Sequence, residues 1–205
     1  GLGILNYESA HRKLPAGCNG CDSGNSRLCS TQPVIERTGA SAFVTILPYM
    51  EEQALYEQFD LKGTIDSSVG PGIWLSGISP SWRNQAKDIA MNARPTSYVC
   101  PTSATEPVTR HGKYASRTYK PATGDYAFSA GHKGPDCCGV SLIDVKTDNS
   151  GMFLYKTVVK MKHLKDGTSK TFAVGETVEG HLPRTSNMWT YFYRHADTMR
   201  TTENS

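Results

Sequence analysis

The six cysteines carry the most reactive side chains in this sequence: Cys18, Cys21, Cys29, Cys100, Cys137 and Cys138. An even number of cysteines in Gly- and Ser-rich loop contexts favours disulfides and an oxidising compartment. The alternative is a metal site, because Cys18-x2-Cys21 and Cys29 offer three thiolates, to which Cys100 or a histidine could add a fourth ligand. A second C-x2-C pair is missing, so the spacing favours disulfides, and their connectivity stays open.

Oxygen ligands gather in the loop between residues 134 and 151, which contains Asp136, Asp144, Asp148 and Asn149. Carboxylate and amide oxygens suit Ca²⁺. The run D-V-K-T-D-N-S-G does not keep the alternating ligand spacing of an EF-hand. We therefore expect no resident cofactor, and a calcium site in this loop is the alternative.

A further candidate for binding is the run Asp166, Gly167 and Thr168. Asp166 and the loop carbonyl groups could hold a cation or a sugar hydroxyl. The same residues suit a turn, because Gly takes positive φ at no steric cost and Asp bonds its own backbone. Since Asp-Gly turns need no ligand, the sequence predicts a structural turn here.

Trp189, Tyr191 and Tyr193 alternate along a predicted strand and therefore share one of its faces. Such a stripe is typical of core or cross-strand packing. If the stripe were exposed instead, it would offer a platform for a glycan or another ligand. Burial is the favoured interpretation, and ligand binding is the alternative.

Catalytic signatures are missing from the sequence. The six histidines occur without an H-E-x-x-H motif, and neither a G-x-S-x-G motif nor a Gly-rich phosphate loop is present. The net charge of +3 is too mild to indicate a nucleic-acid-binding protein, whose basic residues should form a clustered stripe. We expect a protein that is not an enzyme and does not bind nucleic acid.

The elements that must position these residues are helices in the first half of the chain and strands in the second. Apolar residues recur at helical spacing over 1–14, 41–59 and 81–93, with Ile89 and Ala90 directed inward in the last helix. Pro48 must either kink the second helix or open a new one.

Strand chemistry marks residues 96–100, 125–129 and 188–193, and most of all 151–179. In the last run Lys160, Lys162 and Lys165 alternate with apolar residues, which predicts a hairpin with one wet face. The 205 residues are thus expected to form a single domain, 1–205, of the α+β class. Its helices would pack on a mostly antiparallel sheet, with long disulfide-tied loops.

Five phrases occur in an order that resembles one family: GLGILNYESAHRKLPAG, SAFVTILPYMEEQALYEQFD, SYVCPTS, GDYAFSAG and LKDGTSKTFAVGE. They are similar to phrases of the planctomycete-type prepilin-like proteins, a domain of unknown function with a type IV pilin-like leader and a C-terminal H-x9-D-G motif. The resemblance extends from Leu2 to Glu203. Two features depart from the family pattern: Ser103 stands where the family phrase has Asp, and the loop from Cys18 to Cys29 is rich in cysteine.

The resemblance implies a type IV pilin-like head. A hydrophobic helix upstream of Gly1 would anchor the protein in the inner membrane before assembly, and the H-x9-D-G motif would follow Ser205. The head would then be a non-catalytic subunit that self-associates with other pilin-like subunits into an extracellular filament or a pseudopilus of a secretion system. The alternative function is a cell-surface module that binds polysaccharide or another ligand.

Overall fold

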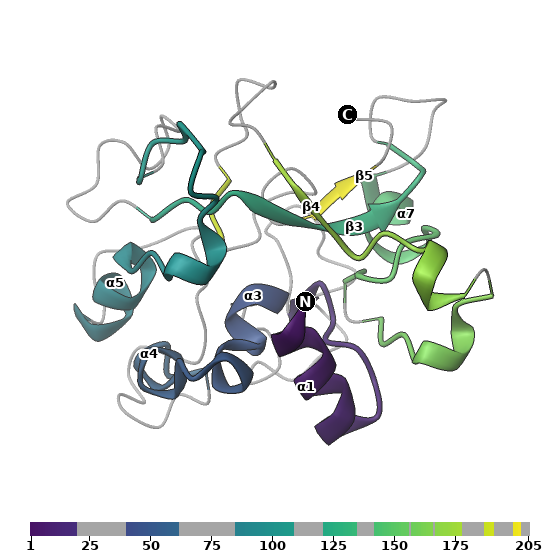
Figure 1. The fold of residues 1–205 in the computed structure, drawn as a ribbon, viewed down its shortest axis with the longest axis horizontal. Coiled ribbons are helices and arrows are strands. Elements are labelled where there is room, and N and C mark those ends of the chain that lie inside the picture. Colours follow the sequence, from purple (N-terminus) through teal and green to yellow (C-terminus); the bar gives the residue numbers. More distant parts are fainter. Residues whose placement is uncertain are drawn as a thin grey trace.

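The computed structural model of this chain describes residues 1–19, 40–61, 85–108, 121–134, 142–155, 157–165, 167–177, 187–190 and 199–201 (Figure 1). Its α-helices are α1 (Leu2–His11), α3 (Ala42–Thr45), α4 (Gln53–Gln58), α5 (Gln85–Asn92) and α7 (Leu142–Thr147). Its 3-10 helices are η2 (Leu47–Met50), η4 (Thr96–Tyr98), η5 (Met161–His163) and η6 (Thr168–Lys170). The strands are β1 (Cys18–Asn19), β2 (Ala40–Ser41), β3 (Tyr126–Gly131), β4 (Val174–Glu176) and β5 (Met199–Thr201). This order of helices and strands is α+β, as predicted.

Strand β3 is the centre of the main sheet, whose order is β4-β3-β5. β4 pairs with β3 in the antiparallel sense, whereas β5 pairs with it in the parallel sense. β1 and β2 form a separate antiparallel pair. The strand predicted at 125–129 is therefore confirmed as the element around which the sheet is built. Figure 1 shows α1, α3 and α4 grouped on one side of this sheet.

The predicted helix 41–59 is three short helices, α3, η2 and α4. Ser41 begins α3, because its Oγ accepts a hydrogen bond from the Val44 N–H (3.4 Å) while it donates one to the Trp189 carbonyl oxygen (2.5 Å). Pro48 lies in the first turn of η2, which confirms that a new helix opens there. Glu51 has a φ of 65°, and this left-handed residue separates η2 from α4.

A row of aromatic rings forms the centre of the core. The ring centroids of successive members lie 4.2 to 5.9 Å apart along the series Phe59, Trp189, Tyr98, Phe43, Phe128 and Phe153. The Tyr98 hydroxyl donates to the Phe43 carbonyl oxygen at 2.7 Å, and burial raises the pKa of Tyr98 well above its usual range. The row joins five separate stretches of sequence, so helices and sheet share one continuous core.

The hairpin predicted over 151–179 is wrong, because β4 is the only strand among the described residues of this run. Residues 160–171 instead form successive tight turns that include η5 and η6. Met161 and Leu164, three residues apart, pack against the core, so the segment follows turn spacing rather than strand alternation. Gly167 has the positive φ of the predicted turn, 83°, and Thr168 begins η6. Asp166, the first residue of the predicted turn, lies outside the described residues.

Two smaller predictions are also corrected. Residues 96–98 are the 3-10 helix η4 rather than a strand, with the Tyr98 N–H bonded to the Pro95 carbonyl oxygen at 3.0 Å. In α5, Ala90 is buried as predicted, but Ile89 is 52% exposed. Within the described residues no helix combines the length and the apolar character needed to cross a bilayer.

A bulge in β3 brings a second segment against the sheet. The register of β3 and β5 shifts between Ser129 and Gly131, which leaves the Ala130 carbonyl oxygen to accept a hydrogen bond from the Gly151 N–H at 3.1 Å. A Cβ on Gly151 would collide with the backbone of Ala130 and Gly131. Gly131 itself has a φ of 114°, a conformation that favours glycine. The contact thus requires glycine on both of the segments that meet there.

We expect Gly151→Ala to lower the free energy of unfolding by about 2–3 kcal/mol, because the new methyl group meets backbone that cannot move aside cheaply. The matched control is Gly175→Ala in β4, where an added Cβ meets no atom within 4 Å. Urea denaturation followed by circular dichroism measures both. Equal stability of the two variants would contradict the close approach at Gly151.

Candidate functional site

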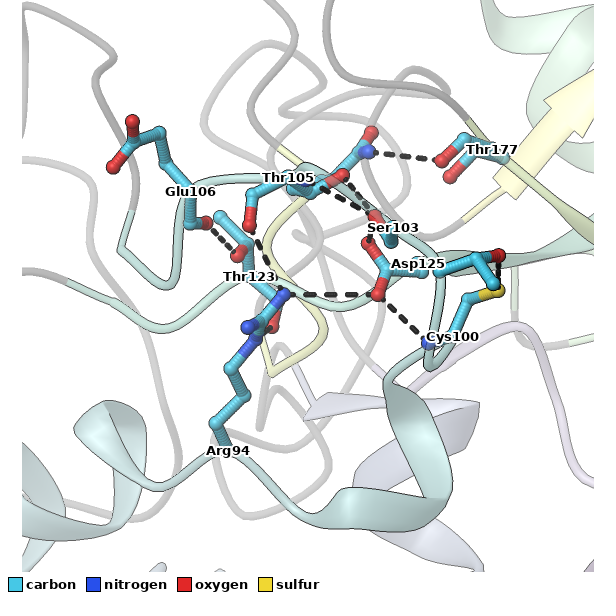
Figure 2. A network of polar contacts seen from close by, with 10 residues as sticks. Arg94, Cys100, Ser103, Thr105, Glu106, Thr123, Asp125 and Thr177 are labelled. Atoms are coloured by element: carbon cyan, nitrogen blue, oxygen red, sulfur yellow. Dashed lines mark hydrogen bonds and ion pairs between the residues drawn. The ribbon is translucent and has the colours of Figure 1, made fainter.

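Asp125 lies directly before β3 and is fully buried at the centre of a polar network (Figure 2). Its Oδ2 accepts a hydrogen bond from the Cys100 N–H at 2.9 Å, and its Oδ1 accepts one from the Ser103 hydroxyl at 2.8 Å. Arg94 Nη2 lies 3.6 Å from Oδ2. A buried carboxylate is tolerated only when it is paired and hydrogen-bonded in this way.

The backbone of Asp125 extends the same network in two further directions. Its N–H donates to the Tyr98 carbonyl oxygen at 2.9 Å, and its carbonyl oxygen accepts from the Thr177 N–H at 2.8 Å. Thr177 follows β4 directly, and Tyr98 ends η4. One residue therefore ties the segment after α5, the start of β3 and the end of β4 together.

Arg94 connects this network to a neighbouring loop. Its Nε donates to the Thr123 carbonyl oxygen at 3.0 Å, and its Nη2 donates to the Thr105 carbonyl oxygen at 3.4 Å. Thr123 also bonds the Glu106 carbonyl oxygen through its hydroxyl (Figure 2). The planar guanidinium thus holds two stretches of main chain and the Asp125 carboxylate at once.

Ser103 is the residue at which the sequence resemblance implies an Asp in related phrases. Its hydroxyl donates to Asp125 and accepts from the Thr105 N–H at 3.0 Å. An ionised carboxylate at this position could accept from Thr105 but could not donate to Asp125. A serine therefore suits this network, in which a donor faces Asp125.

The arrangement can hold main chain in place, and its geometry does not point to a reaction. Both Asp125 oxygens are occupied by donors from the chain itself, and the carboxylate has no exposed surface. A residue that acts on a bound molecule needs a free oxygen or a free lone pair facing it. The network is thus an architectural site built from the phrases SYVCPTS and GDYAFSAG.

The predicted disulfide cysteines have different surroundings. Cys18 is buried in β1, where it pairs with Ser41 across the two strands. Cys100 is partly exposed and carries a free thiol, with its Sγ 3.3 Å from the Thr102 hydroxyl oxygen. The structure shows no disulfide at Cys100. The remaining candidates lie outside the described residues: Cys21, Cys29, Cys137 and Cys138.

The predicted calcium loop is organised by its own side chains. Asn149 Oδ1 accepts from the N–H groups of Lys133 (3.1 Å) and Ser150 (2.8 Å), and its Nδ2 donates to the Lys133 carbonyl oxygen at 2.8 Å. Both acceptor positions of this oxygen are therefore occupied by backbone. Asp148 is exposed and lies 3.6 Å from the Lys133 ammonium group. Asp144 lies in the first turn of α7, and Asp136 is outside the described residues.

Trp189 is 1% exposed, so core packing, the favoured interpretation, holds for this residue. Its indole N–H donates to the Ala93 carbonyl oxygen at 2.9 Å, which satisfies the polar atom of the buried ring. Tyr191 and Tyr193 lie outside the described residues. The burial of Trp189 gives no support to ligand binding at this stripe.

Sequence reasoning from chemistry alone missed Arg94, Ser103 and Asp125. The family phrases contain two of them, since Ser103 closes SYVCPTS and Asp125 is the Asp of GDYAFSAG. Arg94 lies outside these phrases, and the sequence around it contains no motif that points to it. An Asp that opens a strand and is followed by apolar residues is a sign that could have singled out Asp125.

We expect Asp125→Asn to lower the free energy of unfolding by about 2–3 kcal/mol, because the amide replaces one acceptor oxygen by a donor that faces other donors. The control is Asp148→Asn, an exposed carboxylate whose ion pair with Lys133 should contribute less than about 1 kcal/mol. Urea denaturation measures both variants. A loss at Asp125 no larger than that at Asp148 would show that the network does not stabilise the fold.

We expect Cys100 to be alkylated by iodoacetamide in the folded protein without reductant, because its thiol is free and partly exposed. Cys18, which is buried, should stay unmodified until the protein is unfolded. Peptide mass mapping measures the extent of alkylation at each of the two cysteines. A Cys100 peptide that becomes alkylated only after reduction would instead place this residue in a disulfide.

The comparisons with known proteins agree with one part of the sequence prediction. The model of the family SBP_bac_10, described as "Protein of unknown function (DUF1559)", matches residues 1–203. None of the curated proteins and none of the solved structures matches the chain. Since the family model covers almost the whole sequence, the chain belongs to the DUF1559 family of proteins of unknown function.

Proposed function

We propose that this chain is the head of a structural subunit of an extracellular type IV pilin-like filament or pseudopilus. The observation that supports this most is the surface of α1. Leu2 is 72% exposed and Leu5 is 53% exposed, whereas Ile4 between them is buried. The start of α1 therefore carries apolar side chains on the side away from the head as well as on the side that packs against it.

A helix that is apolar all round normally lies among other apolar surfaces. In the proposed filament, a hydrophobic helix upstream of Gly1 would continue α1, anchor the protein in the inner membrane before assembly and pack against the same helix of other subunits. Leu2 and Leu5 would face those neighbouring helices. Burying two leucines in this way contributes about 2–3 kcal/mol per side chain to association.

The contacts of α1 with η2 support a firm connection between such a helix and the head. Gly3 lets the two elements approach closely, since a Cβ there would lie 2.5 Å from Met50 Cγ. Asn6 donates to the Tyr49 carbonyl oxygen at 3.3 Å, and His11 Nε2 lies 2.5 Å from the Tyr49 hydroxyl oxygen. A filament subunit needs this coupling, because the head must keep its orientation on the helix that holds it.

The alternative function, polysaccharide binding at the stripe of Trp189, Tyr191 and Tyr193, is less well supported. Trp189 is buried and its indole N–H is already bonded within the chain. A sugar platform needs exposed aromatic faces. We therefore propose the filament role as the function, and we do not propose polysaccharide binding at this stripe.

The test uses the full-length protein in its own cells, with the double substitution Leu2→Ser and Leu5→Ser. We expect the native protein in the fraction released by mechanical shearing of the cell surface and the double variant to be strongly depleted from it. Both side chains are exposed in the head, so the thermal stability of the variant head should change little.

The control for this experiment is Ile89→Ser, another exposed apolar side chain, on α5, which lies apart from α1 in Figure 1. This variant should enter the sheared fraction as the native protein does. A native protein that is absent from the sheared fraction and present with cytoplasmic proteins would refute the filament role. Normal incorporation of the double variant would refute the role given to the exposed face of α1.

A further inference from the structure

Residues 157–172, which we call the basic segment, form a short basic stretch of the sequence. It contains four lysines and one aspartate, so its formal charge of +3 equals the net charge of the whole chain. The other 189 residues contain 18 basic and 18 acidic side chains and are neutral together. The mild net charge of the protein therefore hides locally basic stretches, of which residues 110–120, outside the described residues, are another.

The backbone of the basic segment keeps its charges close together. The N–H groups of His163, Leu164, Gly167 and Lys170 each bond a carbonyl oxygen three residues earlier, at 2.9 to 3.2 Å. Successive turns of this kind advance only about 2 Å per residue, which is much shorter than a strand. In Figure 1 the two short coils of η5 and η6 lie at the right-hand edge of the molecule, away from α4 and α5.

The side chains divide between core and solvent. The apolar residues Val159, Met161 and Leu164 pack against the core. The lysines are all exposed and form no ion pair with a described residue: Lys160, Lys162, Lys165 and Lys170. Asp166, the one acidic residue of the segment, lies outside the described residues and is not part of the proposed surface.

An exposed aromatic side chain completes this surface. Phe172 is 82% exposed, the largest exposed fraction among the large apolar side chains of the described residues. Its neighbours Thr171 and Ala173 are half-buried, so the backbone directs Phe172 outward while they face the protein. Val158, at the other end of the segment, is 38% exposed. Lysines beside exposed apolar side chains offer charge attraction and an apolar contact to the same partner.

We propose that the basic segment binds the surface of an anionic membrane. The lysine ammonium groups would contact lipid phosphates, and Phe172 would enter the boundary between head groups and acyl chains. Each lysine near an anionic leaflet contributes about 1 kcal/mol, and an inserted aromatic ring adds apolar burial. This inference is independent of the filament role, because it rests only on the charge and exposure of the basic segment.

Other polyanions fit the same surface less well. The segment contains no arginine, the residue whose planar fork suits the bidentate contacts of nucleic-acid recognition. Phe172 is its single Phe, Tyr or Trp residue, and with His163 it offers no continuous row of rings on which successive bases or sugars could stack. A lipid surface needs neither feature, since it presents many phosphates without fixed geometry.

The test measures sedimentation of the 205-residue chain with vesicles. We expect binding to vesicles of phosphatidylcholine with about one third phosphatidylglycerol, and none to phosphatidylcholine alone, because the attraction requires anionic lipid. Binding should disappear at about 0.5 M salt, where charges are screened within a few ångströms.

Two matched variants locate the interaction. Lys162→Gln with Lys165→Gln should weaken binding about tenfold to thirtyfold, as expected for the loss of two lysines from an anionic surface. Lys87→Gln, on α5, with Lys133→Gln removes the same number of charges outside the basic segment and should change binding less than about threefold. Circular dichroism melting verifies that both variants are folded.

Phe172→Ser separates a membrane from a soluble polyanion. It should weaken vesicle binding several-fold and leave retention on a heparin column unchanged, whereas Ile89→Ser, the control, should change neither. Absence of binding to anionic vesicles, or equal loss with the two lysine pairs, would overturn the proposal. Heparin retention without vesicle binding would overturn it in favour of an anionic polysaccharide.

Discussion

The described part of the fold depends on a carboxylate that has no exposed surface, that of Asp125. Asp125 receives hydrogen bonds from Cys100 and Ser103, and its own main chain bonds Tyr98 and Thr177. These contacts determine where the loop after η4 ends, where β3 begins and where β4 stops. A buried carboxylate is costly unless every partner is present, so the segments that provide those partners have to be in place together. The central strand is therefore positioned by polar contacts at the residue directly before it and by aromatic packing along its length.

Local patterns predicted the elements whose apolar side chains follow one period. The strand at 125–129, the break at Pro48 and the positive φ at Gly167 all follow from properties of single residues or short runs. The α+β class follows from the order of such runs. Burial of Trp189 was also the favoured interpretation, because large aromatic residues in a strand pattern are usually packed.

Other features depend on contacts between distant residues and could not be predicted from the sequence. In residues 157–172 the alternation of lysine with apolar residues is compatible with a strand and with a series of tight turns, and packing of Met161 and Leu164 on the core decides between them. Asp125 and Arg94 are separated by 31 positions, so their pairing has no local signature. Ile89 was expected inside by helical spacing, but Ala90 occupies the buried side of α5. In each case tertiary contacts outweighed the local preference.

The meeting of Gly131 and Gly151 has a consequence for how sequences of this family can diverge. A Cβ on either residue would meet main-chain atoms of the other segment, and main chain cannot be made smaller by a second substitution. No compensating change elsewhere would therefore tolerate a larger residue at one of these positions while the bulge of β3 persists. Relatives with this crossing should retain both glycines, and relatives without it should be free to vary at both. The joint occurrence of the two glycines in an alignment would then mark which relatives share this crossing.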